Sequence, residues 1–402
     1  MRVLVTCWAW SSHYLPLVPL VQALRAAGHE VCVASQDSMA GVVTGSGAAF
    51  VAAGPDVDHA ELRARHMRGL SHDRVPAAPP PGAEAAGHWR SGQREKVARV
   101  FGAFAARADL MVDDTLRFAR HWRPDLVVFE PTSYAGPLVA ALLGVPAVRH
   151  IHGVDMTYQA RDIVPEVLAP TAARLGLDGC AVLGDLTVDP CPPSMQIPAE
   201  VERATVGYVP YNGRAVLPRW LWEPPDRPRI ALTWGATTTS VGGAKSFLPP
   251  RVVAALAGAD AEIVVAVGRD DLERLGPVPD GVRAVTGVAL HQLLPTCSAL
   301  IHQGGFGSTL TGVHHGVPQL VLPQLPDQVF GAARLAATGA GTVLAPEEAD
   351  AGALRAAVAD LLGSAERRRA VARLRAEMNA QPRTADLVPV LSRLAERSSQ
   401  PA

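Results

Sequence analysis

Residues 298–328, SALIHQGGFGSTLTGVHHGVPQLVLPQLPDQ, contain a strand pattern, a glycine-rich turn and a helix pattern in direct succession. Ala299-Leu300-Ile301 is an apolar run of strand length, a glycine-rich turn follows, and Ser308-Thr309 opens the helical pattern. This order is typical of phosphate-binding sites. Glycines let the backbone approach the ligand, and the unpaired N–H groups of the first helical turn point toward it. The Ser308 and Thr309 hydroxyls and the His302 ring add further hydrogen-bond donors.

A second strand pattern follows at Gln319 to Leu322, and it leads to Asp327 and Gln328. In a parallel sheet these two residues would lie beyond the carboxyl end of a strand, where such sheets bind ligands. A carboxylate and an amide at that edge suit sugar hydroxyls better than phosphate. The segment therefore predicts a site for a phosphate and a sugar side by side.

A strand-end histidine, a glycine turn, Ser-Thr and a downstream Asp-Gln at this spacing resemble the nucleotide-sugar signature of the GT-B glycosyltransferases. Within them, the sequence is similar to the bacterial enzymes that glycosylate antibiotics and other natural products. The glycines alone would also fit an ordinary structural turn. The resemblance covers nearly the whole chain and is strongest over residues 1–35, 125–152, 206–240 and 283–328. It implies an α/β fold in which two Rossmann-like βαβ domains face one another across a cleft.

At 402 residues the chain has the length of two domains, and two α/β series are visible in it. The first starts with the apolar strand at Val3, and the second starts with the strand at Ile230. With the resemblance, we expect an acceptor-binding domain at 1–211, a linker at 212–228, a nucleotide-sugar-binding domain at 229–380 and a helix at 381–402 that returns to the first domain. Residues 55–96 are expected to form a loop beside the acceptor site, and residues 151–228 to be irregular.

Composition narrows the range of partners. Lys and Arg number 37 against 38 Asp and Glu, so no basic excess indicates nucleic acid or acidic lipid. Five cysteines without CxxC spacing favour a reducing compartment. The N-terminal apolar run is too short for a signal peptide, and no run of about 18 apolar residues is long enough for a membrane span. We expect a cytoplasmic protein without stable membrane insertion.

Sugar transfer with inversion needs a base for the acceptor proton and a means of stabilising the leaving diphosphate. His13 follows the first strand, where similar glycosyltransferases carry their catalytic histidine, and imidazole groups titrate near neutral pH. Glu130 ends the strand pattern at 125–130, where many relatives carry an aspartate that orients the histidine. Without the resemblance, His13 would also fit a plain loop residue and Glu130 a solvated strand-end carboxylate.

The resemblance also assigns the donor site. It places the donor sugar at Asp327 and Gln328, and the nucleotide base near Val288, because Gly287 cannot stack on it. The resemblance implies the metal independence typical of this family, so we expect neither metal nor cofactor. The diphosphate is expected at Thr233, Gly235, Thr237, His302, Gly304, Gly305, Gly307, Ser308 and Thr309.

The sequence thus predicts an inverting glycosyltransferase with two small-molecule partners. These are a nucleotide-activated sugar, with a dTDP-deoxysugar favoured over a UDP-sugar, and an apolar natural-product aglycone; a homodimer stays open. Two alternatives remain, a nucleotide-sugar epimerase of the same fold and a non-catalytic auxiliary subunit that binds the nucleotide sugar. An NAD-dependent oxidoreductase is disfavoured because no GxGxxG follows the first strand.

Overall fold

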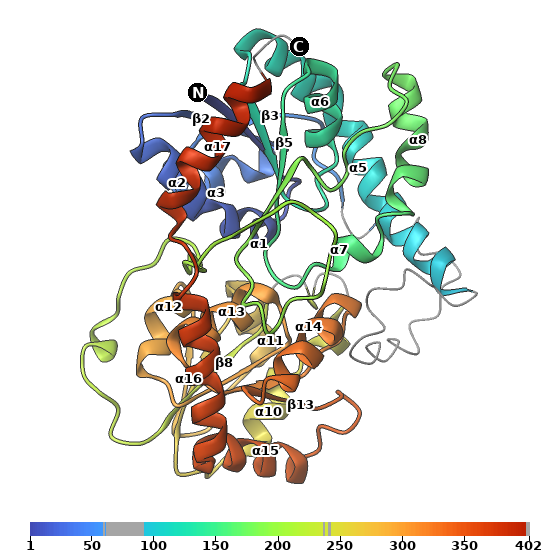
Figure 1. Ribbon diagram of the computed structural model, residues 1–402. Helices are drawn as coiled ribbons and strands as arrows, with labels where there is room; N and C mark the ends of the chain where they lie inside the picture. Colours follow the sequence, from blue (N-terminus) through green and yellow to red (C-terminus); the bar gives the residue numbers. More distant parts are fainter. Residues whose placement is uncertain (59–60, 62–91, 236–237, 240–242, 399–402) are drawn as a thin grey trace.

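Two parallel β-sheets organise the chain, one in each half of the sequence (Figure 1). The computed structural model describes residues 1–58, 61, 92–235, 238–239 and 243–398. Most of the loop expected at 55–96, and Thr237, lie outside the described residues. The prediction of two Rossmann-like α/β domains is confirmed.

The first sheet has seven strands in the order β3-β2-β1-β4-β5-β6-β7, all parallel. Its central strands are apolar throughout because helices cover both faces, and Val3, Leu4 and Val5 are at most 1% exposed. The strands are β1 (Arg2–Thr6), β2 (Glu30–Ser35), β3 (Ala49–Ala52), β4 (Leu126–Phe129), β5 (Ala147–His150), β6 (Leu186–Asp189) and β7 (Arg203–Thr205). The helices are α1 (Ser11–Tyr14), α2 (Val18–Ala26), α3 (Ala40–Gly45), α5 (Gln93–Trp122), α6 (Ala135–Leu143), α7 (Met156–Gln159) and α8 (Val164–Arg174).

The second sheet has six parallel strands in the order β10-β9-β8-β11-β12-β13. They are β8 (Arg229–Thr233), β9 (Glu262–Ala266), β10 (Val282–Val285), β11 (Ala299–His302), β12 (Gln319–Val321) and β13 (Gly341–Val343). The helices are α10 (Pro249–Leu256), α11 (Arg269–Leu275), α12 (Leu290–Leu293), α13 (Phe306–His315), α14 (Pro326–Ala337), α15 (Ala351–Gly363), α16 (Ala365–Asn379) and α17 (Thr384–Ser398).

The strand order fixes where each sheet can bind a ligand. In open α/β sheets the ligand site lies outside the carboxyl ends of the strands, at the point where the order reverses. That point falls between β1 and β4 in the first sheet and between β8 and β11 in the second. His13 and Glu130 follow the first pair of strands, and the glycine-rich turn follows β11.

The chain crosses between the two halves twice. After the linker it enters β8, and at the other end α17 runs back to the first domain and packs beside α2 (Figure 1). Leu387, Val388 and Leu391 of α17 are buried in the same hydrophobic cluster as Leu20 and Val21 of α2. The two crossings lie side by side, because the Gly207 N–H, just before the linker, donates to the carbonyl of Pro382, just before α17 (2.8 Å).

Residues 151–228 are more regular than the sequence indicates. This region contains the eleven-residue helix α8 and the short strands β6 and β7. Strands of four and three residues are too short to show a periodicity, and Pro165 and Pro170 obscure the helical pattern of α8. Tertiary pairing, of β6 with β5 and of β7 with β6, rather than local sequence preference, creates these strands.

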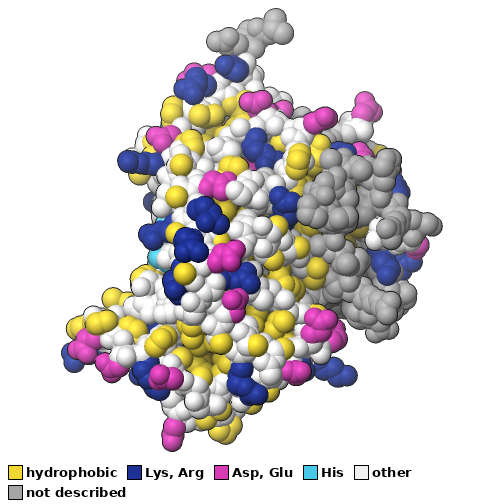
Figure 2. Space-filling view, turned by 60° about the horizontal axis from the view of Figure 1, so that its bottom comes forward, with side chains coloured by type: hydrophobic (Ala, Val, Ile, Leu, Met, Phe, Trp, Pro, Cys, Tyr) yellow, Lys and Arg dark blue, Asp and Glu magenta, His cyan; other side chains and the backbone are white. Residues whose placement is uncertain are grey.

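The face turned toward the viewer in Figure 2 carries basic and acidic side chains interspersed with one another.

Within the described ranges, no helix combines the length and apolar character that crossing a bilayer requires. All five cysteines are free, and Cys7, Cys32 and Cys191 are buried.

Candidate active site

The site begins with a histidine and a carboxylate in hydrogen-bond contact at the ends of two neighbouring strands. β1 and β4 are parallel, with Thr6 opposite Phe129, so the residues that follow them emerge at the same edge. Nδ1 of His13 lies 2.9 Å from Oε2 of Glu130. The Glu130 side chain is fully buried, whereas that of His13 is 18% exposed. The imidazole is therefore partly open to solvent while its carboxylate partner stays out of water.

This contact determines which nitrogen of His13 can accept a proton. A carboxylate only accepts hydrogen bonds, so Nδ1 carries the hydrogen and donates it to Glu130. The lone pair of a neutral ring is then on Nε2, and no described residue hydrogen-bonds to that atom. A strand-end carboxylate that fixes the tautomer of an exposed imidazole is the arrangement of a general base.

Trp8 and Thr132 hold this pair in place, and sequence reasoning missed both. Thr132 donates its N–H to Oε2 of Glu130 (3.0 Å), and its hydroxyl lies 2.9 Å from the carboxylate. Trp8 donates its indole N–H to the Thr132 hydroxyl (2.9 Å), and its ring centroid lies 4.7 Å from that of His13. The sequence does contain a signal for Thr132, because a hydroxyl residue two positions after the strand-end carboxylate Glu130 can hydrogen-bond to it.

Aromatic rings continue from Trp8 into the first domain. The centroids of Trp8 and Trp10 are 5.2 Å apart, those of Trp8 and Phe104 are 5.8 Å apart, and Phe101 lies 5.8 Å beyond Phe104. The guanidinium of Arg107 stacks 4.6 Å from the Trp8 ring centroid. An apolar, aromatic wall therefore adjoins the His13 ring.

The glycine-rich turn lies between β11 and α13. Gly304 has a φ of +98°, a conformation that L side chains rarely adopt. Gly305 is the N-cap of α13, and the helical bonding begins with the Thr309 N–H donating to the Gly305 carbonyl. The earlier N–H groups of a helix have no intrahelical partner, and the helix dipole adds positive potential there. The turn is thus built as an anion site, with the half-buried Ser308 in its first helical turn.

His302, predicted as a donor to phosphate, has protein partners at both of its ring nitrogens in this structure. Its side chain is fully buried; Nδ1 accepts from the Gly304 N–H (3.0 Å), and Nε2 donates to Oε1 of Gln319 (2.9 Å). Both ring nitrogens are therefore occupied by the protein. The ring therefore contacts the glycine-rich turn through the main chain of Gly304.

Three other predicted donor residues are also turned inward. The Thr233 hydroxyl donates to the Ala266 carbonyl (2.8 Å), and the Thr309 hydroxyl donates to the Gly305 carbonyl (3.1 Å). Gln328 is 2% exposed; its amide oxygen caps the start of α14, and its amide nitrogen donates to the Thr238 hydroxyl (2.8 Å). Their predicted contacts with the donor stay predictions. The side chains shape the walls of the site.

Gln303 is a donor-side residue that the sequence did not single out. A Cβ on Gly235, in the loop after β8, would lie 2.5 Å from Nε2 of Gln303, so the two loops pack without space for a side chain. The same amide lies close to Gly305. Gln303 is 3% exposed, and its Oε1 has no hydrogen-bond partner among the described residues. The amide therefore lies where the two predicted diphosphate loops meet.

Asp327, in the second domain, interacts electrostatically with His13 of the first domain. It is half-buried in the first turn of α14, and burial raises its pKa above the ordinary carboxyl value. The charge of His13 acts in the opposite direction on that pKa, so the two groups are close enough to interact. Asp327 thus lies on the donor side, opposite the imidazole.

The predicted base site keeps an open position. Gly287 has a φ of +69°, and no atom lies within 4 Å of where its Cβ would be. Val288, predicted to contact the base, is half-buried and packs against the hydrophobic cluster that contains Leu290 and Leu293. No set of three or more His, Cys, Asp or Glu side chains is arranged for a metal ion in the part of the chain that the structure describes.

A cavity of about 580 Å³ lies elsewhere, beside the linker. It is lined by Trp220, Arg229 and Arg283, among others, at the amino-terminal ends of β8 and β10. Glu262 pairs with both arginines, and both guanidiniums stack on the Trp220 ring. Because ligands of such sheets bind at the carboxyl ends of the strands, we place no substrate there.

Buried neutral histidines predict a loss of stability in acid. Burial lowers the pKa of His302 and of His150 to about 4 each. Unfolded histidines titrate near pH 6.5, so between pH 6.5 and 4 the unfolded chain binds more protons, and the free energy of unfolding falls as pH falls. Asp189 offsets part of this, because burial raises its pKa to about 6. Above pH 6.5 the stabilisation is complete.

Denaturant unfolding of the wild type and of His302→Asn between pH 7.5 and 5 measures this effect. We expect the free energy of unfolding of the wild type to fall toward pH 5 more steeply than that of the variant. The difference between the two slopes should be up to about 1.4 kcal/mol for each pH unit. Identical slopes in the two proteins would mean that His302 is not held neutral by burial.

Two facing Rossmann-like domains, with an imidazole–carboxylate pair on one and a glycine-rich anion turn on the other, define a glycosyltransferase of the GT-B class. Residues 22–235 match the family described as "Erythromycin biosynthesis protein CIII-like, N-terminal domain", and residues 250–394 match the corresponding C-terminal domain. The chain belongs to this family of antibiotic glycosyltransferases.

Curated relatives match over nearly the full length. Tylactone mycaminosyltransferase of Streptomyces fradiae is 38% identical, over 98% of this chain and 92% of its own. The 10-deoxymethynolide desosaminyltransferase of Streptomyces venezuelae is 37% identical, over 100% of this chain and 99% of its own. The solved structures agree. VinC in complex with dTDP has a TM-score of 0.82 at 32% identity, covering 99% of this chain and 100% of that one. The spinosyn rhamnosyltransferase SpnG with spinosyn aglycone has a TM-score of 0.82 at 30% identity, covering 98% and 100%.

Proposed function

We propose that this enzyme transfers a deoxysugar from a dTDP-sugar to an apolar natural-product aglycone, with inversion and with His13 as the general base. The observation that carries the proposal is the hydrogen-bonded pair of His13 and Glu130. Nε2 of His13 has no hydrogen-bond partner among the described residues, and the His13 ring lies close to the start of α13. His152 stands between them, with its ring centroid 5.1 Å from that of His13 and 6.1 Å from that of Phe306.

The proposed step moves one proton and exchanges one bond. Nε2 of His13 removes the proton of the acceptor hydroxyl as its oxygen attacks the anomeric carbon. The bond from that carbon to the diphosphate oxygen breaks, and dTDP leaves with the bonding electrons. Glu130 stabilises the imidazolium that forms, and the N–H groups at the start of α13 stabilise the departing diphosphate.

The substrates follow from the two sides of the cleft. Trp8, Trp10 and Phe104 give the first domain an aromatic wall next to His13, which suits an apolar aglycone. Asp327 on the second domain offers a carboxylate to sugar hydroxyls. Two relatives are named as a tylactone mycaminosyltransferase and a 10-deoxymethynolide desosaminyltransferase, and VinC was solved with dTDP, which supports a dTDP-sugar donor and a natural-product acceptor here.

A transfer assay tests the proposal. The protein is incubated with dTDP-deoxysugars and a panel of macrolactone and aromatic polyketide aglycones, and products are followed by mass spectrometry. We expect a glycoside and one dTDP per product, with the anomeric configuration opposite to that of the donor by NMR. A new nucleotide sugar formed without acceptor would indicate an epimerase. Binding of dTDP without any reaction would indicate an auxiliary subunit.

Two glycines of the turn should separate folding from donor binding. Gly304→Ala places a side chain at a φ of +98°, so we expect a loss of about 1–3 kcal/mol in the free energy of unfolding. Gly307 has no atom within 4 Å of an added Cβ, so Gly307→Ala should fold normally. Its methyl group would enter the proposed diphosphate site, and we expect the Kd for dTDP to rise about tenfold or more. Unchanged dTDP affinity in Gly307→Ala would place the diphosphate elsewhere.

A further inference from the structure

The ring of Phe306 is held between two glycines from different domains. Phe306 is the first residue of α13 and is 8% exposed. A Cβ on Gly153, in the loop after β5, would lie 2.2 Å from two atoms of the ring; one on Gly331, in α14, would lie 2.7 Å from a third. Neither glycine has a positive φ. The ring itself, rather than the backbone conformation, therefore requires glycine at both positions.

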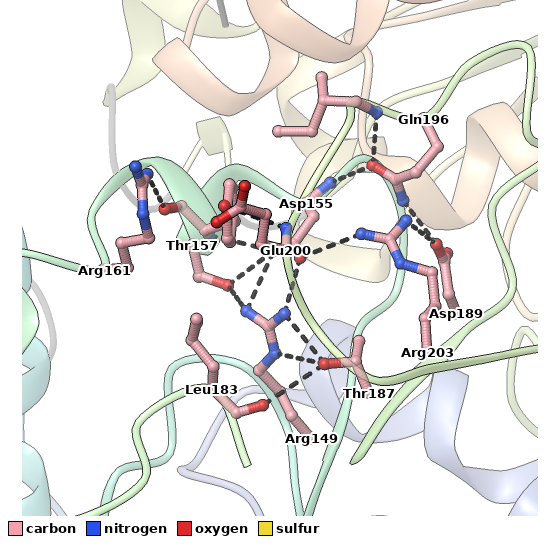
Figure 3. A network of polar contacts seen from close by, with 12 residues as sticks. Arg149, Asp155, Thr157, Arg161, Leu183, Thr187, Asp189, Gln196, Glu200 and Arg203 are labelled. Atoms are coloured by element: carbon pink, nitrogen blue, oxygen red, sulfur yellow. Dashed lines mark hydrogen bonds and ion pairs between the residues drawn. The ribbon is translucent and has the colours of Figure 1, made fainter. Parts of the chain in front are cut away.

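The loop that contains Gly153 is fixed by a buried polar network (Figure 3). Asp155 is paired with Arg149, with two contacts of 3.1 and 2.7 Å, and both side chains are at most 1% exposed. Gln196 accepts from the Asp155 N–H (2.9 Å) and donates to the Gly153 carbonyl (3.3 Å). Gly153 is thereby held in position against the sheet of the first domain.

The same network reaches across to the second domain. Arg334 of α14 donates to the main-chain carbonyls of Met195 and Gln196, at 2.9 Å each. The helix that supplies Gly331 is therefore connected to the loop that holds Gly153. Gly153 and Gly331, which pack against the Phe306 ring, therefore lie in segments that are hydrogen-bonded to each other through Gln196. The position of the ring is restricted on both of these sides.

His152 contacts both Phe306 and the proposed base, His13. Its ring is edge-on to that of Phe306 on one side and to that of His13 on the other. Trp8 lies against His13, with the two ring centroids 4.7 Å apart, so among the described residues the base has an aromatic neighbour in addition to His152. Burial lowers the pKa of His152 well below its ordinary value, and His13 and His150 lower it further. A neutral neighbour does not oppose the positive charge that His13 gains during transfer.

We propose that Phe306 and His152 are positioning residues that couple the donor turn to the His13 base. The inference rests on the proposed transfer function. Phe306 opens the helix whose N–H groups face the diphosphate, so its ring follows any adjustment of the turn to the donor. His152 passes that adjustment to the imidazole across two ring contacts. The base is then fully aligned only when the donor turn is in place.

A double-mutant cycle tests the coupling. Gly153→Ala should lower kcat about tenfold or more, and by a larger factor than it raises the Kd for dTDP, because the added methyl displaces the Phe306 ring on the side that contacts His152. Phe306→Ala should also lower kcat. Because the ring is what the methyl meets, the double variant should be no slower than Phe306→Ala alone. Gly179→Ala is the matched control, since an added Cβ there meets nothing within 4 Å. Effects of the two variants that simply multiply would overturn the proposal.

His152 provides a test that does not depend on the clash at Gly153. His152→Phe keeps a ring between Phe306 and His13, and we expect its kcat to stay within about threefold of the wild type. His152→Ala removes the ring and should lower kcat about tenfold at an unchanged donor KM. Equal losses of kcat in the two variants would show that the ring contact does not position the base.

A spectroscopic measurement separates this inference from the proposed function. The His13 imidazole resonances are followed by NMR as dTDP is added to the wild type and to Phe306→Ala. We expect dTDP to shift them in the wild type and to shift them much less in the variant. Absence of dTDP binding to the wild type would refute the proposed donor. Binding that leaves the His13 signals unmoved would refute the coupling alone.

Discussion

Replacing His13 by alanine is expected to lower kcat by about 10²–10⁴-fold, the usual contribution of a general base, while leaving dTDP affinity unchanged. The reason is that different domains bind the donor and remove the acceptor proton. Nε2 of His13 is the acceptor-side nitrogen without a described protein partner, whereas the donor turn belongs to the other domain. Single-turnover kinetics with saturating donor measure the first effect, and calorimetry with dTDP measures the second.

His121→Ala is the matched control, because His121 is an exposed histidine near the end of α5. It should transfer sugar at the wild-type rate. Transfer by His13→Ala at the wild-type rate would show that another group takes the acceptor proton. A raised Kd for dTDP in His13→Ala would instead mean that the ring contributes to donor binding.

The sequence was sufficient to pair His13 with Glu130. Both follow apolar runs that read as buried parallel strands, and adjacent parallel strands end at the same edge of a sheet. The 2.9 Å contact is therefore a consequence of strand order that a pattern can reveal. The same reasoning located the glycine-rich turn, because a helix start after a strand is visible in local sequence.

The direction of a side chain was not predictable in the same way. His302 and Gln328 were both expected to face the ligand because they lie in the right segments. His302 instead bonds to Gln319 on the neighbouring strand, and Gln328 bonds to Thr238 in another loop. Such partners come from distant parts of the chain, and local periodicity carries no information about them.

The contact of Phe306 with Gly153 shows the same limit at the junction of the domains. Gly153 has no turn conformation that would mark it, and its lack of a side chain matters only because a ring from the other half packs there. His152 likewise had no partner that the sequence could name. Strand order predicts which residues share an edge within one sheet, but the packing of one domain on another decides these contacts.

Replacing Glu130 by glutamine should leave the fold intact and lower kcat by about 10²–10⁴-fold, because the amide has the size of the carboxylate but not its charge. The Glu130 side chain is fully buried and accepts hydrogen bonds from Thr132 and His13. An amide oxygen can keep these contacts, but it cannot stabilise the imidazolium that forms as the acceptor loses its proton. The thermal midpoint of the variant, measured beside that of the wild type, checks that the fold is intact.

The combination of the two substitutions is more informative than either alone. If Glu130 acts only through the imidazole, then His13→Ala/Glu130→Gln should be no slower than His13→Ala, because groups that act as a unit are strongly non-additive. Glu130→Asp keeps the charge and should recover part of the kcat lost in Glu130→Gln, less than fully because the shorter side chain withdraws from Nδ1. Losses that multiply in the double variant would assign Glu130 a role that does not pass through His13, such as a direct contact with the acceptor. Measured kcat values for these four variants and the wild type, with dTDP affinity as the control for an intact donor side, decide between the two roles.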